Sequence, residues 1–202
     1  MKQNRKVIVI TGGIATGKTT VAQYLKKRGY TVIDADELVR FLYQKGEKVY
    51  LQLVELVGDT ILNDACEIDR RKLTEYIFEN EDHLKSVNRI VHQAVVQEIN
   101  NRLKKEAGKN VFLDIPLMIE EKEKLMDYGL NYDEIWLVYA NEETQVNRLL
   151  KRDDRDPDKS MMLLRSQMPI KDKKEQSDKV LYNMSSLEDL YNDIDDLLKE
   201  IH

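Results

Sequence analysis

The eight residues from Gly12 to Thr19 carry the strongest chemical signal in this chain. They read Gly-Gly-Ile-Ala-Thr-Gly-Lys-Thr, which matches the phosphate-binding pattern G-x-x-x-x-G-K-[ST] at every fixed position. In this pattern the loop backbone turns its N–H groups toward phosphate oxygens, and a helix that begins near Lys18 adds the positive end of its dipole. The alternative is a glycine turn followed by a chance Lys-Thr. The motif predicts a nucleoside triphosphate site formed by Gly12, Gly13, Ile14, Ala15, Thr16, Gly17, Lys18, Thr19 and Thr20.

Lys18 and Thr19 are the two side chains of this loop with direct chemical roles. We expect the Lys18 ammonium to bridge the β- and γ-phosphates and to act in catalysis. We expect the Thr19 hydroxyl to bind Mg²⁺ directly, because the ion neutralises phosphate charge during transfer. The chain has no Asn-Lys-x-Asp tetrad of the kind that reads guanine in GTPases. That absence disfavours a nucleotide-dependent switch.

Two carboxylates follow apolar runs that are typical of buried strands. Asp36 stands just after the second predicted strand, and the carboxyl ends of parallel strands face the ligand crevice. Asp36 is therefore a candidate for the base that takes the proton of an attacking hydroxyl, although it could equally be a helix N-cap. Asp114 ends the run from residue 111 and is a candidate Mg²⁺ contact, either direct or through water. The alternative is a strand-end Asp with local hydrogen bonds only.

Arg148 and Arg152 lie four residues apart, which is one helical turn. Both guanidinium groups could therefore bracket phosphates that become more negative in a transition state. A solvated helix face is the alternative interpretation. Spacing alone does not decide between the two.

The elements that must position these residues alternate along the chain. Short apolar runs predict strands at residues 7–10, 30–33, 111–113, 135–139 and 180–182, with helical sequence between them. This alternation predicts an α/β fold with a parallel sheet. The long interval from 37 to 109 has no convincing strand and reads as a helical insert. The tail from Ser186 spaces its apolar residues three and four apart, which predicts a closing amphipathic helix.

Length and composition exclude several classes of protein. With 202 residues, 42% hydrophobic and 34% charged, the chain suits one globular unit with a small insert. The net charge of -5 argues against a nucleic-acid-associated ATPase or a membrane surface as partner. Cys66 is the only cysteine, which fits a reducing compartment, and no apolar stretch is long enough for a signal peptide or a membrane span. We therefore expect a cytoplasmic protein.

Taken together, the motifs resemble the dephospho-CoA kinase family over nearly the whole chain. The resemblance is carried, in order, by residues 11–14 before the loop, 32–36, 69–73, 114–117 with Glu120, Gln145 with Arg148 and Arg152, and 167–169. The chain departs from the family pattern at three places. It has Ala15 where the family usually has Gly, His92-Gln93 in place of His-Pro, and Leu181-Tyr182 in place of Ile-Asp.

The resemblance implies a three-layer P-loop NTPase core with a five-stranded parallel sheet, a helical substrate-binding insert and a helical lid. Residues 1–36, 109–147 and 176–202 would form the nucleotide-binding core. Residues 37–108 would form the helical acceptor domain, and residues 148–175 the lid.

The resemblance also implies an activity: transfer of the ATP γ-phosphate to the ribose 3′-hydroxyl of dephospho-CoA, the last step of coenzyme A synthesis. The residues it implies are Asp36, Lys18 and Arg148 for catalysis, Arg152 and Asn183 for ATP, and Asp36, Arg70, His92 and Asp114 for the acceptor. Mg²⁺ is the implied cofactor, and a monomer or weak homo-oligomer is expected. The main alternative is another P-loop nucleoside or nucleotide kinase, although the long insert better suits a bulky acceptor.

Overall fold

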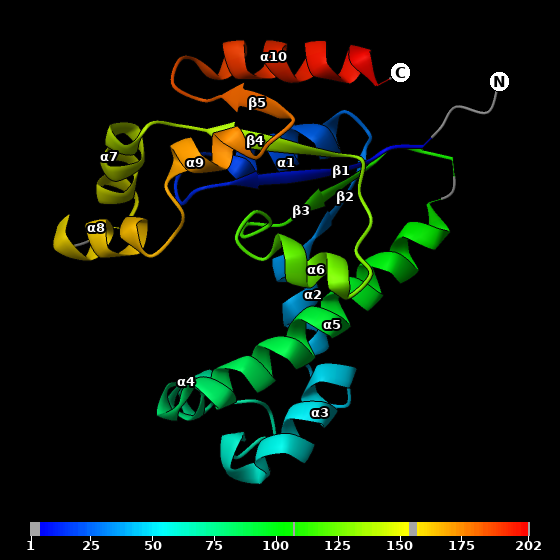
Figure 1. Ribbon diagram of the computed structural model, residues 1–202, viewed down its shortest axis with the longest axis vertical. Helices are drawn as coiled ribbons and strands as arrows, with labels where there is room; N and C mark the ends of the chain where they lie inside the picture. Colours follow the sequence, from blue (N-terminus) through cyan, green and yellow to red (C-terminus); the bar gives the residue numbers. More distant parts are fainter. Residues whose placement is uncertain (1–4, 107, 154–156, 202) are drawn as a thin grey trace. The chain divides into compact units, whose positions relative to one another are not determined.

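The computed structural model describes residues 5–106, 108–153 and 157–201, without the side chains of residues 152–159. Five strands are interleaved with helices, and two longer intervals, between β2 and β3 and between β4 and β5, hold several helices in succession (Figure 1). In order they are β1 (Val7–Gly12), α1 (Lys18–Lys27), β2 (Thr31–Asp34), α2 (Ala35–Leu42), α3 (Lys48–Val57), η1 (Asp59–Ile61), α4 (Arg70–Glu79), α5 (Glu81–Lys105), β3 (Val111–Asp114), α6 (Lys122–Asp127), β4 (Glu134–Tyr139), α7 (Glu142–Asp153), α8 (Pro157–Arg165), α9 (Ile170–Glu175), β5 (Lys179–Tyr182) and α10 (Leu187–Glu200).

The five strands form one sheet in the order β2-β3-β1-β4-β5. β1 pairs in parallel with both β3 and β4, and β4 pairs in parallel with β5. The predicted α/β fold with a five-stranded parallel sheet is therefore confirmed. The register sets Ile10 of β1 opposite Asp114 of β3, so the strand that leads into the phosphate-binding loop ends beside this carboxylate.

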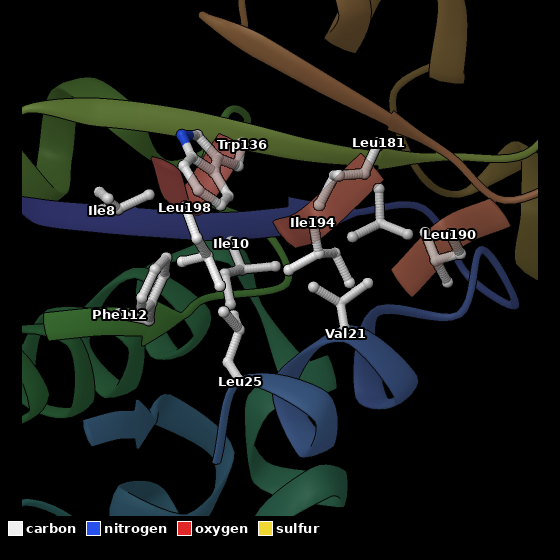
Figure 2. Close-up of a cluster of buried hydrophobic side chains, with 11 residues drawn as sticks. Ile8, Ile10, Val21, Leu25, Phe112, Trp136, Leu181, Leu190, Ile194 and Leu198 are labelled. Carbon is white, nitrogen blue, oxygen red and sulfur yellow. The ribbon is translucent and has the colours of Figure 1, made fainter. Parts of the chain in front are cut away.

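One face of the sheet is covered by the first and last helices. Figure 2 shows side chains of α1 and α10 pointing into the same cluster as side chains from β1, β3, β4 and β5. Trp136 and Phe112 are the largest members and are fully buried. Residues of β1 alternate between the two faces, and Val9, which faces away from this cluster, is fully buried too. Burial on both faces explains why the strand reads as a continuous apolar run.

The start of the closing helix α10 is determined by a local capping signal, and the helix is also stabilised by packing. Ser186 is its N-cap, and the side chain accepts a hydrogen bond from the N–H of Asp189 at 3.1 Å. The Asp189 carboxylate in turn accepts from the Ser186 N–H, which completes a capping box. The amphipathic helix expected from Ser186 onward is therefore present.

The chain divides into two compact units. The first comprises residues 1–33, 106–122 and 131–202 and holds the phosphate-binding loop; the second comprises residues 34–105 and 123–130. In the second unit α2, α3 and α4 pack against the long helix α5. The described residues of the 37–109 interval contain no strand, only one isolated bridge between Leu62 and Ile68. No helix in the described part of the chain is long and apolar enough to cross a membrane.

Candidate active site

The phosphate-binding loop leads into the N-terminus of α1, which no described side chain caps. Gly17 is the N-cap of α1 in a left-handed conformation, with φ at 95°. The first N–H groups of α1 are therefore available to an anionic ligand. A Cβ atom at Gly17 would overlap the side-chain amide of Asn183, so only glycine fits. The loop is also tied internally, because the Thr16 hydroxyl donates to the Gly13 carbonyl at 2.9 Å.

Ala15 adopts the left-handed conformation that normally favours glycine. Its φ is 57°, and Cys66 is the only other non-glycine residue with a positive φ in the described chain. The conformation brings Cβ close to the carbonyl oxygen that follows it, and this costs about 1 kcal/mol. The departure from the family pattern noted above thus falls at a strained backbone position.

We expect Ala15→Gly to raise the free energy of unfolding by about 0.5–1 kcal/mol, because relief of the left-handed strain outweighs the greater freedom of glycine in the unfolded chain. Thermal unfolding of the two proteins measures this. Ala22→Gly, in the middle of α1, is the matched control and should lower stability by about 1 kcal/mol or more. A lower free energy of unfolding in Ala15→Gly would show that the backbone at Ala15 is not strained.

Lys18, the first residue of α1, forms an ion pair with Asp114 at the end of β3. Asp114 is 4% exposed, and the Lys18 side chain is 16% exposed. The segment after Asp114 is tied to the end of β1, because the Thr11 hydroxyl donates to the Pro116 carbonyl at 3.0 Å. The structure therefore brings the predicted catalytic lysine and the predicted metal-contacting carboxylate together, and each partially shields the other from water.

Arg148 and Asn183 hold the loop from its β5 side. The Arg148 guanidinium donates to the carbonyls of Ala15 and Thr16, both at 3.3 Å, and to the Asn183 carbonyl at 2.9 Å. The buried Asn183 side chain donates to the Thr16 carbonyl at 2.8 Å. These bonds are made to backbone, so in this structure both residues brace the loop. The phosphate role of Arg148 and the nucleotide role of Asn183 remain predictions. Arg152 lies on α7, and its side chain is outside the described residues.

A further group of residues contacts the loop from the segment between α8 and α9. Gln167 accepts a hydrogen bond from the Ile14 N–H at 2.9 Å. This segment is anchored by Glu120, whose carboxylate lies 2.6 Å from the ammonium of the fully buried Lys173. Gln167 and Glu120 were recognised in the sequence only as parts of motifs, and Lys173 was missed. Lys173 sits in a run of charged residues, which normally indicates a solvated surface, so no sequence signal could have found it.

A cavity of about 330 Å³ adjoins the loop at this point. It is lined by Gly13, Gln167 and Gln145, together with residues of β4, α7, α8 and α9. Gln145 is 2% exposed and donates to the Ala140 carbonyl at 2.8 Å. The wall of this cavity nearest the loop is therefore built from neutral amide side chains.

In the second unit, Asp36 and Arg70 line a cavity of about 370 Å³. Its other described walls are Val39, Arg40, Tyr43, Leu73, Thr74 and Ile77. Burial raises the pKa of the Tyr43 hydroxyl, and the positive charge of Arg70 offsets only part of the rise, so Tyr43 remains protonated at neutral pH. His92 is half-buried on α5 and is not among the described residues that line this cavity. The structure thus groups two of the predicted acceptor residues and leaves His92 apart.

The N-cap alternative for Asp36 is wrong. The N-cap of α2 is Asp34, whose side chain accepts from the Glu37 N–H at 3.0 Å. Asp36 lies in the first turn of the helix with an exposed side chain. Its carboxylate is therefore not used in capping and stays available for chemistry.

Solved structures show the same architecture. The crystal structure of TT1252 from Thermus thermophilus matches with a TM-score of 0.80 at 31% identity and covers 98% of this chain and 99% of its own. A dephospho-CoA kinase from Campylobacter jejuni matches with a TM-score of 0.64 at 23% identity, over 98% of this chain and 97% of its own, and supports the fold alone.

A parallel sheet with a phosphate-binding loop after its central strand, and a strand-end carboxylate paired with the loop lysine, defines a P-loop nucleotide-binding protein. The model of the dephospho-CoA kinase family matches residues 6–189. The chain therefore belongs to the dephospho-CoA kinase family. It is 37% identical over 198 residues to the dephospho-CoA kinase of Streptococcus mutans, covering 97% of this chain and 98% of that protein. It is 39% identical over 199 residues to the dephospho-CoA kinase of Streptococcus agalactiae, covering 97% and 99%.

Proposed function

We propose that this protein phosphorylates the ribose 3′-hydroxyl of dephospho-CoA with ATP, giving coenzyme A and ADP. The observation that carries the proposal is the family match over residues 6–189 in a chain whose loop keeps every fixed residue of the phosphate-binding motif. We expect the protein to act in the cytoplasm, as a monomer or weak homo-oligomer. The Lys18–Asp114 ion pair beside the loop supports a working phosphoryl-transfer site.

On the nucleotide side, the phosphates would lie against the loop backbone and the open end of α1. Lys18 would then exchange part of its contact with Asp114 for the β- and γ-phosphates. Since transfer needs little covalent chemistry from the protein, positioning and electrostatics supply most of the rate. The bonds from Arg148 to the carbonyls of Ala15 and Thr16 keep the loop in shape for this task.

The donors present fit a magnesium ion. Thr19 offers a hydroxyl and Asp114 a carboxylate, which are the hard oxygen ligands that Mg²⁺ prefers. Within the described residues no three His, Cys, Asp or Glu side chains cluster as a metal site, so the ion would depend on nucleotide phosphates for further ligands. When bound, it would offset the negative charge of the phosphates during transfer.

On the acceptor side, the cavity of the second unit supplies groups suited to a phosphorylated ribose. Asp36 can accept the proton of an attacking hydroxyl, and Arg70 can pair with a phosphate on the same ligand. Tyr43 adds a protonated hydroxyl that can donate a hydrogen bond. Leu73 and Ile77 provide apolar wall that suits the body of a ligand.

The test is release of ADP from Mg²⁺-ATP by the purified protein, with and without dephospho-CoA, with the product identified by mass. We expect release to depend on the acceptor and the product to be heavier by one phosphoryl group. A matched reaction with adenosine or AMP as acceptor addresses the alternative of a nucleoside or nucleotide kinase. Nucleotide binding without any response to dephospho-CoA would overturn the acceptor assignment and leave the nucleotide site standing.

A further inference from the structure

Gln167 reaches across from the segment between α8 and α9 to the phosphate-binding loop. Its side-chain oxygen accepts from the backbone N–H of Ile14 at 2.9 Å. The orientation of the amide follows from chemistry, because the reversed amide would set its NH₂ donors against the N–H donor of Ile14. The two N–H donors on Nε2 are therefore directed away from Ile14 and make no hydrogen bond to protein in the described chain.

We infer that Gln167 binds the terminal phosphoryl group of the bound nucleotide and donates to it from Nε2. The inference rests on the nucleotide part of the proposed function and needs no assumption about the acceptor. The side chain is half-buried and lines the cavity next to Gly13, so its donors are close to the loop and reachable by a ligand.

The place of Ile14 in the loop indicates which phosphate Gln167 meets. The helix end and the second half of the loop cradle the α- and β-phosphates, and the lysine reaches the β- and γ-phosphates. Ile14 lies four residues before Lys18, in the first half of the loop. The phosphate chain extends away from the helix end, so a donor held at Ile14 borders its terminal group.

The residues that follow Gln167 are held by contacts with Glu120 and by the start of α9. The next residue, Met168, donates its N–H to Glu120 at 3.4 Å, and Pro169 follows as the N-cap of α9 with a fixed φ of -52°. Glu120 also pairs at 2.6 Å with Lys173, which is fully buried, although this approach is poorly aligned for a hydrogen bond. Glu120 follows β3, the strand that ends at Asp114, so one anchor links Gln167 to the strand that carries the Lys18 partner.

The neutral amide is the important feature of this residue. It accepts from the loop with one atom and donates to an anion with the other, which neither a carboxylate nor an ammonium group can do. Gln167→Ala removes both interactions. Gln167→Glu keeps an acceptor for the Ile14 N–H but replaces the donors with a negative oxygen, so it separates support of the loop from contact with the phosphoryl group.

The experiment measures binding of ADP and of a non-hydrolysable β,γ-imido ATP analogue to the full chain by calorimetry. We expect Gln167→Ala to weaken the analogue about 10-fold, the size of one hydrogen bond to a charged group, and ADP less than 2-fold. Gln167→Glu should weaken the analogue further and again spare ADP. Gln23→Glu, the same chemical change at an exposed position of α1, is the control and should alter neither affinity.

Two results would overturn the inference. Equal losses for ADP and the analogue would make Gln167 a support of the loop alone. Unchanged or tighter binding of the analogue by Gln167→Ala would mean that the side chain merely occupies the Ile14 N–H until a nucleotide displaces it. Neither readout involves dephospho-CoA, so failure of the acceptor assignment leaves this test intact.

Discussion

Lys18→Ala should lower kcat about 10³-fold while the protein stays folded. The ammonium is the one loop side chain that can follow negative charge from the β- to the γ-phosphate during transfer, and a fixed charge of this kind in a water-poor site contributes several kcal/mol. In this structure it is only 16% exposed and pairs with Asp114, so its charge is already oriented toward the strand end. Steady-state kinetics with saturating Mg²⁺-ATP and dephospho-CoA would measure the loss.

The control for this experiment is Lys26→Ala, which removes the same charge from an exposed position in the last turn of α1. Its turnover should match the parent protein. Thermal unfolding of Lys18→Ala is needed as well, because the substitution leaves the nearly buried Asp114 carboxylate without its lysine partner. Loss of the folded state would show that Lys18 is structural, and near-normal turnover by folded protein would remove it from catalysis.

Asp36→Asn should reduce kcat about 10²- to 10³-fold, with ATP affinity changed by less than 2-fold. The amide keeps the size of the carboxylate but cannot take the proton of the attacking hydroxyl, and general base catalysis contributes about this factor. Asp36 is exposed in the first turn of α2 and shares a cavity with Arg70 in the second unit, so we expect the substitution to leave the fold intact and to cost the helix only a small charge effect. Kinetics and calorimetric titration with ATP separate the two effects.

Asp34→Asn is the matched control, two residues away. Asp34 caps α2 through the Glu37 N–H, and asparagine is as good an N-cap as aspartate. Turnover should therefore survive this change. If Asp34→Asn loses activity and Asp36→Asn keeps it, the base has been assigned to the wrong carboxylate of the pair.

Local sequence was sufficient to predict the elements of the core. The strands at β1 and β4 are buried on both faces, and such strands need an unbroken apolar run that stands out in the sequence. The phosphate-binding loop was equally plain, because a Cβ atom at Gly12 or at Gly17 would clash with neighbouring atoms, which leaves glycine at two positions of fixed spacing. α10 carried its own start signal in the Ser186 capping box.

Roles that depend on a choice between similar side chains were not readable from spacing. Asp34 and Asp36 are both acidic and both near a helix start, and only the folded chain shows that Asp34 makes the capping bond. Arg148 was expected on phosphates, and the structure adds four hydrogen bonds from its guanidinium to Ala15, Thr16 and Asn183. Those partners lie 35 to 133 residues away in the chain, so no local pattern records them.

The residue pattern alone was enough to predict the parallel sheet, the loop, the closing helix and the family, because each depends on residues that are neighbours in the chain or on burial that forces an apolar run. The burial of Lys173 against Glu120 and the hydrogen bond between Gln167 and Ile14 are visible only in the folded chain. A charged or amide side chain reads as exposed wherever its neighbours are polar, and its burial depends on distant segments that fold over it. The physical reason is that hydrogen bonds and ion pairs act over a few ångströms in space, whatever the separation along the chain.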